Sequence, residues 1–325
     1  MIAGGKDVIE PIGETMKKTM LAVCLSALMV TCNVAAMTRT LKKDPAIVIA
    51  AFGTTTKASA TYDFIEKQLI STSSLKKYTI NWAFTSEIVR ERANNAFAKK
   101  GLETRYLSLA QVLANLESEG YRKIVVQPLH IFPGQEYLET EKVVNAFRTL
   151  GLRIEFGDTL LHKWEYMFES VEALEEELLQ VNQGCNILVA HGTPKTSPGS
   201  NATYLGLDRY LSQKYKNVFV GTVDGVLTRE QALNKAKTCD PKQVKFIPFM
   251  LVAGDHIMND IMGKESDDEG VLSWSMEMKK AGFSVDSLYT DYDGKKLYKG
   301  LGFNKKIVEI FSHQIEKSLE RLEAY

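Results

Sequence analysis

The sequence lacks several signatures that would assign it to a common class of protein. Its 40 Lys and Arg balance its 40 Asp and Glu, so no net charge attracts the chain to nucleic acid or to an anionic membrane. Only four cysteines occur, and none of them forms a Cys-x-x-Cys pair, which leaves a zinc knuckle or a thioredoxin-type site without support. The Gly-x-Gly-x-x-Gly loop, the Walker loop and the Gly-x-Ser-x-Gly nucleophile elbow are also missing. These absences argue against nucleotide-binding proteins and serine hydrolases.

The chain has room for two folded domains, preceded by a segment with the pattern of an export signal. Its 325 residues exceed one typical domain, and the 45% hydrophobic and 25% charged content is that of a globular protein. Lys17 and Lys18 precede an apolar stretch, residues 20–30, that is too short to cross a bilayer. Val34-Ala35-Ala36 then offers a small-residue cleavage site. We therefore expect residues 1–36 to be a signal peptide and the mature protein to be periplasmic.

Other interpretations of the N-terminal segment remain open. Met16 offers a second start, which would make residues 1–15 an upstream mis-start. Cys32 would anchor a lipoprotein if it were the acylated residue, and an uncleaved signal would form an anchor helix. Cleavage after residue 36 leaves Cys185 and Cys239, which an exported protein can oxidise to a disulfide. The sequence does not show that they meet, and we expect two buried thiols.

The chain contains an internal repeat. The matching segments are residues 50–55 (AAFGTT) with 189–194 (VAHGTP), and residues 127–136 (QPLHIFPGQE) with 247–256 (IPFMLVAGDH). In this register Phe52 matches His191, and Glu136 matches His256. A duplicated half-fold would place these side chains at equivalent strand ends around one cleft, an arrangement that suits a divalent metal.

Strands and helices alternate along the chain, the pattern of parallel β-α-β units. The expected strands are residues 46–52, 79–84, 123–131, 152–156, 186–190, 217–223, 243–252 and 283–288. The expected helices are residues 59–70, 87–99, 107–119, 137–150, 165–180, 203–214, 229–237, 271–281 and 304–322. We predict an α/β fold of two similar domains, each a parallel sheet flanked by helices, with a cleft between them. A boundary near residues 160–163 gives an N-terminal domain at 37–163 and a C-terminal domain at 164–325.

Polar side chains gather at the predicted strand ends, where open parallel sheets bind their ligands. His191, Asp224 and His256 follow strands of the second half. Glu87, His130 and Glu136 likewise follow strands of the first half. Two neutral imidazoles and a carboxylate hold a divalent cation and leave coordination positions open, and an imidazole can also accept a proton. The sequence therefore predicts either metal-assisted chemistry or a metal that is itself handled as a substrate.

The segment Gly254–Trp274 is the most unusual stretch of the chain. Long loops at strand ends are often functional. Met262 and Trp274 would give an apolar wall for a large planar ligand, and packing of Trp274 against the sheet is the alternative. The acidic residues 267–269 are expected to form a solvated face.

Taken in order, these motifs resemble those of the anaerobic sirohydrochlorin cobaltochelatases of the class II chelatase superfamily, over residues 45–322. The motifs that carry the resemblance are AFGT (51–54), QPLH (127–130), PGQE (133–136), AHGT (190–193), GTVDG (221–225), GDH (254–256), ND (259–260) and SW (273–274). The resemblance implies two α/β domains with a tetrapyrrole cleft between them. It also implies insertion of a divalent metal into sirohydrochlorin, with release of two pyrrole protons, in tetrapyrrole and cobalamin biosynthesis.

The resemblance also assigns roles to individual residues. His191 and His256 match the paired metal-binding and catalytic histidines, and Glu136 matches an active-site carboxylate. Asp224 matches the acidic metal-site position, which is usually Glu in this family, so its shorter side chain holds the carboxylate further back. His130 matches a histidine through which some exported members bind haem.

Substrate contacts are expected from residues near the strand ends of both halves. The candidates are Phe52, Gly53, Thr54, Glu87, Arg90, His130 and Trp274. Arg92 and Lys264 are further candidates, by position, to bind the carboxylates of the substrate.

The sequence does not select one metal. Two histidines and a carboxylate accept Co²⁺, Fe²⁺ or Ni²⁺, and availability decides among them in the cell. The metal is a substrate, and no prosthetic group is expected apart from haem on His130. We expect no nucleic-acid partner and no membrane span after processing, and a homo-oligomer is compatible with the sequence. Two other functions stay open: a periplasmic carrier that binds metal or tetrapyrrole without turnover, and a ferrochelatase that serves haem or sirohaem.

Overall fold

The computed structural model describes residues 40–194, 198–266 and 269–324. The predicted signal peptide, Cys32 and most of the acidic segment 267–269 therefore lie outside the described residues. From Lys42 onward the chain clusters as one compact unit.

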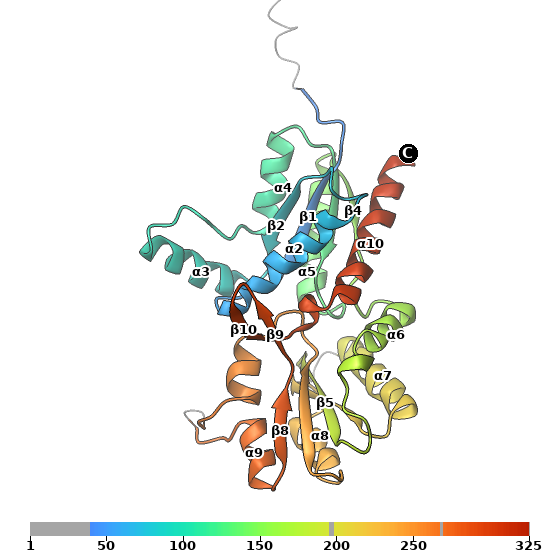
Figure 1. Ribbon diagram of the computed structural model, residues 1–325. Helices are drawn as coiled ribbons and strands as arrows, with labels where there is room; N and C mark the ends of the chain where they lie inside the picture. The colour runs from blue at the N-terminus through green and yellow to red at the C-terminus, as the bar shows by residue number, and fades with distance from the viewer. Residues whose placement is uncertain (1–39, 195–197, 267–268, 325) are drawn as a thin grey trace, which may run out of the picture. The chain divides into compact units, whose positions relative to one another are not determined.

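Two four-stranded parallel sheets form the framework, and both have the same strand order (Figure 1). The first sheet has the order β2-β1-β3-β4, and the second has the order β6-β5-β7-β8. Their strands are β1 (Ala46–Ala51), β2 (Ile80–Phe84), β3 (Lys123–Pro128), β4 (Arg153–Phe156), β5 (Cys185–Gly192), β6 (Val218–Asp224), β7 (Gln243–Pro248) and β8 (Ser284–Ser287). Every pairing within these two sheets is parallel. The predicted α/β fold with two parallel sheets is confirmed.

The register between β1 and β3 in the first sheet matches that between β5 and β7 in the second. Ala50 lies opposite Pro128 in the first sheet, and Val189 lies opposite Pro248 in the second. Just beyond each proline the next N–H returns to the central strand: Leu129 donates to the Ala50 carbonyl and Phe249 to the Val189 carbonyl, both at 2.8 Å. The internal repeat read from the sequence is therefore a repeat of backbone geometry.

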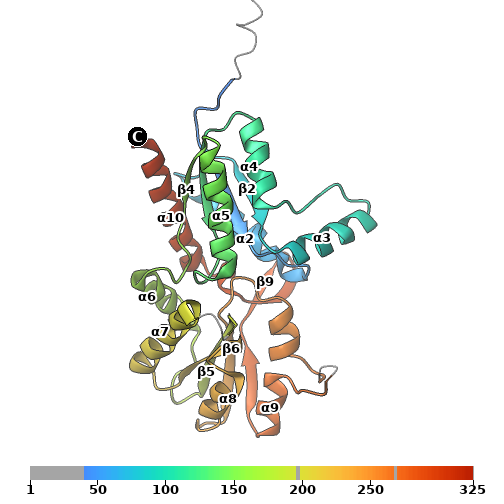
Figure 2. The same ribbon diagram turned by 180° about the vertical axis from the view of Figure 1, so that it is seen from behind.

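Helices cover both faces of each sheet (Figure 2). The α-helices are α2 (Ala60–Ser71), α3 (Glu87–Lys99), α4 (Leu109–Ser118), α5 (Gln135–Thr149), α6 (Trp164–Glu172), α7 (Pro198–Lys214), α8 (Arg229–Ala236), α9 (Trp274–Lys280) and α10 (Lys305–Glu323). Four short helical turns are η1 (Lys57–Ser59), η2 (Glu175–Glu177), η3 (Ile257–Ile261) and η4 (Leu301–Phe303). The starts of α4 and α8 carry capping boxes, in which Ser108 or Thr228 exchanges hydrogen bonds with a glutamine three residues later. Such local signals explain why most helix positions could be read from the sequence.

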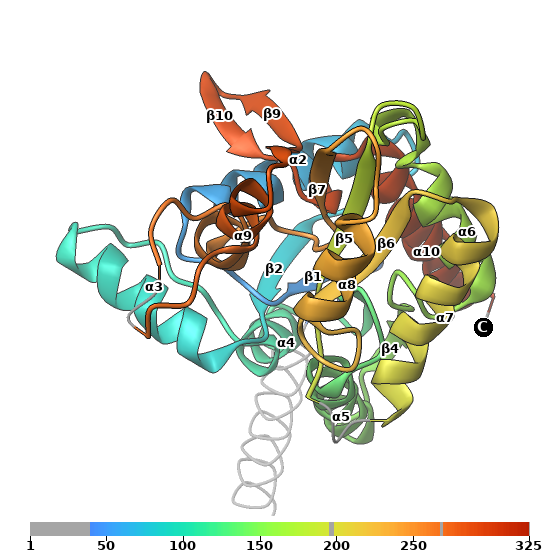
Figure 3. The same cartoon turned by 90° about the horizontal axis from the view of Figure 1, so that it is seen from below.

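Two parts of the structure differ from the elements expected. The helix predicted at 165–180 ends at Glu172, and the chain continues as a bend and the short turn η2. A hairpin that was not predicted, β9 (Tyr289–Tyr292) with β10 (Lys295–Tyr298), follows β8. It lies beside α2, where Lys67 donates to the Tyr292 hydroxyl at 2.9 Å (Figure 3).

The last helix connects the two halves. Although α10 follows the second sheet in sequence, it packs against β3 and β4 of the first (Figures 1 and 2). Its buried Gln314 accepts a hydrogen bond from the Gln127 amide of β3 at 2.9 Å. The apolar residues of α10 join one continuous core with residues of both sheets. Division of the chain into domains at 37–163 and 164–325 stays a prediction.

Cys185 and Cys239 form a disulfide, so the expectation of two separate thiols was wrong. Cys185 begins β5, and Cys239 follows α8, which packs against that strand. This packing brings their Cα atoms to 6.2 Å, within the range that a disulfide spans. Across the described ranges 40–194, 198–266 and 269–324, none of the helices has the length and apolar character needed to cross a bilayer.

Candidate functional site

Two histidines meet at the carboxyl edge of the second sheet. His191 lies near the end of β5, and His256 immediately precedes the turn η3. Their ring centroids are 4.9 Å apart, with the rings nearly edge to face. The structure thus brings together the two imidazoles that the sequence analysis paired, at the edge where open α/β sheets bind ligands.

A carboxylate orients the imidazole of His256. Its Nδ1 lies 2.6 Å from Oδ2 of Asp260, one helical turn later. Because a carboxylate accepts hydrogen bonds, this contact places the proton on Nδ1 and leaves the lone pair on Nε2. The sequence analysis used Asp260 only as part of a motif and gave it no role. Its spacing of four residues from His256 was the signal that could have identified it.

A backbone carbonyl orients His191 in the same sense. Nδ1 of His191 lies 3.2 Å from the Gly192 carbonyl, which can only accept. Both imidazoles therefore offer Nε2 to a cation. Desolvation of the ring lowers the pKa of His191 below its ordinary value, and the neighbouring His256 lowers it further. The neutral form, which binds metals, is favoured.

Gly192 provides this geometry through a backbone conformation that suits glycine. Its φ is +83°, and a Cβ at this position would overlap the carbonyl oxygen of Asp224 across the β5–β6 ladder. The close approach aligns the ends of the two strands. His191 and Asp224 are thereby held on neighbouring strands.

Asp224, the third predicted metal ligand, ends β6 and is exposed. Its charge raises the pKa of His191, so the two groups interact. Within the described part of the chain, however, no three His, Cys, Asp or Glu side chains gather into a group that could hold a metal ion. The structure brings together the histidine pair and does not bring Asp224 into a three-ligand set with it.

The first half carries a different cluster at the corresponding edge. Glu136, in the first turn of α5, accepts a hydrogen bond from Thr85, and burial raises the pKa of Glu136 above its ordinary value. Nε2 of His130 lies 3.4 Å from Oγ1 of the same threonine. Arg90 contributes a nearby positive charge that lowers the pKa of Glu136. Neither His191 nor His256 is among the groups that shift the pKa of Glu136.

The geometry of His130 gives no support to haem binding. Burial lowers the pKa of His130 to about 4, so the ring is neutral. A haem iron needs a ring nitrogen open to it, whereas Nε2 faces Thr85 and Nδ1 is buried with no hydrogen-bond partner among the described residues.

The loop after β1 lies next to the loop that leads to His256. A Cβ placed on Gly254 would lie 3.3 Å from Oγ1 of Thr54. In the same first-half loop, Gly53 donates its N–H to the Tyr62 hydroxyl at 3.1 Å, and Phe52 is 48% exposed. These predicted substrate contacts therefore lie in a loop next to the one that leads to His256, and they remain predictions.

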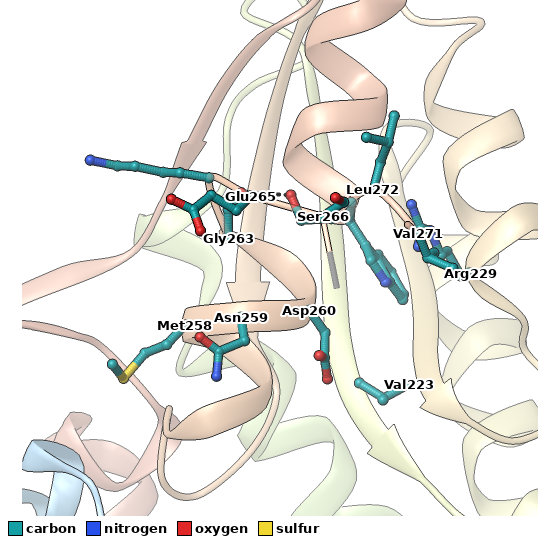
Figure 4. A pocket seen from close by; sticks show the side chains of 13 residues that line it. Val223, Arg229, Met258, Asn259, Asp260, Gly263, Glu265, Ser266, Val271 and Leu272 are labelled. Carbon is teal, nitrogen blue, oxygen red and sulfur yellow. Dashed lines mark hydrogen bonds between the residues drawn. The ribbon is translucent and has the colours of Figure 1, made fainter. Parts of the chain in front are cut away.

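Glu87 and Arg90, in the first turn of α3, line a small cavity of about 250 Å³ together with Arg105 and Tyr106. A larger cavity of about 520 Å³ adjoins the histidine pair through Asp260, which lines it (Figure 4). Trp274 also lines this cavity but is only 2% exposed, because its ring packs against Phe246. The structure therefore places Trp274 in the core rather than in a freestanding apolar wall, and contact with substrate stays a prediction.

Comparisons with known proteins identify the family of this chain. The model of the cobalt chelatase (CbiK) family matches residues 45–320. The sirohydrochlorin cobaltochelatase of Salmonella typhimurium is 25% identical over 280 residues, which cover 84% of this chain and 96% of that protein. Sirohydrochlorin cobaltochelatase CbiKC of Nitratidesulfovibrio vulgaris is 28% identical over 205 residues, covering 62% of this chain and 68% of that protein.

Solved structures share the fold. SirB from Bacillus subtilis, solved with Fe³⁺, has a TM-score of 0.57 at 15% identity, covering 86% of this chain and 98% of SirB. The sirohydrochlorin chelatase SirB from Bacillus subtilis subspecies spizizenii, in complex with cobalt, has a TM-score of 0.54 at 15% identity, with 86% and 97% covered. Because the family model spans nearly all of the described chain, this protein belongs to the cobalt chelatase (CbiK) family.

Proposed function

We propose that this protein is a sirohydrochlorin cobaltochelatase, which inserts Co²⁺ into sirohydrochlorin in cobalamin biosynthesis. One observation carries the proposal: two imidazoles, with ring centroids 4.9 Å apart at the carboxyl edge of a parallel sheet, both engage Nδ1 with an acceptor of the protein, which leaves Nε2 to bind a cation. Membership of the CbiK family supplies the macrocycle and the reaction.

In this function His191 and His256 hold the incoming cation through their Nε2 atoms. Two protein nitrogens leave most coordination positions of the cation free. The ring nitrogens of the macrocycle can therefore bind at the free positions first and then replace the two imidazoles one at a time. Each divalent cation that enters the ring displaces two pyrrole protons, and the charge of the macrocycle is unchanged by the exchange. Neutral imidazoles are needed throughout, which the lowered pKa of His191 favours.

Glu136 is our candidate acceptor for a pyrrole proton. Burial raises its pKa, which makes its carboxylate a stronger base than an exposed glutamate. Asp224 lies exposed beside His191 and would contribute to attracting the cation rather than to a closed ligand set.

Cobalt is the metal we propose as substrate, with Fe²⁺ as the alternative. The two curated relatives are cobaltochelatases, and the SirB structures contain cobalt or Fe³⁺. Ni²⁺ has no comparable support. Imidazole nitrogen suits several first-row metals, so competition between them must be measured.

We further propose that the protein acts outside the cytoplasm. The N-terminal segment has the pattern of a signal peptide, and disulfides persist in oxidising compartments, which suits the Cys185–Cys239 bond. Fractionation of the native host, together with N-terminal sequencing of the mature chain, tests this. A cytoplasmic protein with an intact residue 36–37 bond would contradict export.

The enzymatic test uses the chain from residue 37, sirohydrochlorin and Co²⁺ under anaerobic conditions, followed by the absorbance of the macrocycle. We expect turnover well above the spontaneous rate, and a loss of at least about 100-fold in His191→Ala and in His256→Ala. His313→Ala is the matched control, because His313 is exposed on α10. Stoichiometric binding without acceleration would instead identify a periplasmic carrier.

A further inference from the structure

We infer that Asp260 is a positioning residue that fixes the tautomer and the direction of His256 for metal capture. The inference rests on the proposed function. Its basis is the 2.6 Å contact between Oδ2 of Asp260 and Nδ1 of His256. A partner of this kind on the remote nitrogen of a metal-binding histidine fixes which nitrogen is free and makes it a better donor.

The turn that carries Asp260 is firmly anchored. It is the π-helical turn η3, in which Met262 N–H donates to the Ile257 carbonyl at 3.0 Å. Ile257 and Ile261 are both fully buried in the core beneath the second sheet. Single π-helical turns are frequent at functional sites, because they change the facing of nearby side chains. The anchored turn holds the carboxylate at a fixed distance from the imidazole.

Arg229, which also lines the cavity, is engaged by another carboxylate. It pairs with Glu277 at 3.0 Å. In the part of the chain that the structure describes, the recorded hydrogen-bond partner of the Asp260 side chain is His256. The carboxylate thus serves the histidine rather than a neighbouring cation.

The two histidines differ in the charge of their acceptors. His191 donates to a neutral carbonyl, whereas His256 donates to a carboxylate. A charged acceptor on one ring nitrogen makes the other nitrogen a stronger ligand for a metal than a neutral acceptor does. Loss of Asp260 should therefore weaken the capture of the metal and leave the binding of the macrocycle unchanged.

The chain offers a matched control on the same turn. Asp255 accepts a hydrogen bond from Asn259 at 2.9 Å, also four residues apart, but does not contact a histidine. Asp255→Ala removes a similar contact from the turn and keeps the His256 partner. If Asp260 only stabilised the turn, both alanine variants would behave alike.

Three variants, Asp260→Ala, Asp260→Asn and Asp255→Ala, are compared in two measurements. The first is the KM for Co²⁺ and for sirohydrochlorin in steady-state turnover. The second is the ¹⁵N chemical shifts of the His256 ring in the metal-free protein, which report the tautomer directly. Asp260→Asn keeps the shape of the side chain and its carbonyl acceptor, and serves if the alanine variant does not fold.

We expect Asp260→Ala to raise the KM for Co²⁺ by about 10- to 100-fold, with the KM for sirohydrochlorin unchanged. Asp260→Asn should fall between this variant and the wild type, and Asp255→Ala should match the wild type. The ring should carry its proton on Nδ1 in the wild type and lose this preference in Asp260→Ala. An unchanged KM, an equal effect in Asp255→Ala, or an unchanged tautomer would overturn the inference. If the wild type shows no turnover, the proposed function fails and the tautomer measurement alone decides the role of Asp260.

Discussion

Replacement of Gly192 by alanine tests whether the strand-end geometry that positions His191 depends on glycine. Gly192 has φ = +83° and lies against the backbone of Asp224 on the adjacent strand. Its carbonyl also orients the imidazole of His191. The substitution adds only one methyl group, yet it acts on the backbone of two strands and on the metal site together.

The expected loss of stability has two parts. An L-residue in the left-handed region costs about 1–2 kcal/mol. The added Cβ also meets a carbonyl oxygen that is fixed by the β5–β6 ladder, and forced overpacking of this kind costs a further 1–3 kcal/mol, roughly. We therefore expect Gly192→Ala to lower the free energy of unfolding by about 2–5 kcal/mol.

Gly101→Ala separates these two parts. Gly101 has a similar φ of +67°, but a Cβ there would meet nothing within 4 Å. Urea unfolding of both variants should show only the conformational cost of about 1–2 kcal/mol in Gly101→Ala. Chelatase activity, measured well below the unfolding transition, should fall in Gly192→Ala and stay unchanged in Gly101→Ala. Equal unfolding energies for the two variants would refute the role of the close strand approach.

Three further predictions concern the disulfide, the His191 imidazole and the Glu136 carboxylate. The Cys185–Cys239 disulfide closes a loop with a sequence separation of 54, and its reduction should lower the free energy of unfolding by about 4 kcal/mol. Urea titrations with and without reductant measure this difference, and coincident curves would contradict it. The His191 ring should titrate below the ordinary histidine value of about 6.5 in NMR, because desolvation and the nearby His256 disfavour its protonation; a midpoint above that value would show that the carboxylates of Asp224 and Asp260 outweigh these effects. Glu136→Gln should lower kcat by about 100-fold, with the KM for Co²⁺ little changed, and an unaffected kcat would assign the proton to another group.

The sheets and most helices could be predicted because their signals are local and repeated. Continuous runs of β-branched residues, such as Ala46–Ala51, are typical of strands buried on both faces, and the structure buries every residue of β1. The same run of elements occurs twice, so the second half supported the interpretation of the first. The convergence of His191 and His256 followed from this repeat, because parallel strands present their carboxyl ends at one edge.

The features that were missed depend on contacts between distant residues or on a signal that was overlooked. The disulfide between Cys185 and Cys239 requires knowledge of how α8 packs on β5, which no local pattern gives. The hairpin of β9 and β10, by contrast, had a local signal. Asp293 and Gly294 join its strands with φ of 50° and 68°, the two positive angles that an Asp-Gly hairpin turn requires.

The two halves use one backbone plan for different chemistry. Where the second half has His191 and His256, the first half has Phe52 and Glu136 at the matching strand-end positions. Phenylalanine does not bind a metal, and a carboxylate whose pKa is raised by burial is suited to accept a proton. A chelatase exchanges one cation for two protons, so its cation donor and its proton acceptor must not compete for the same ion. Duplication of the half-fold, followed by divergence of its strand-end residues, places the histidine pair and Glu136 on separate sheets, while the loop at Thr54 remains next to the loop that carries His256.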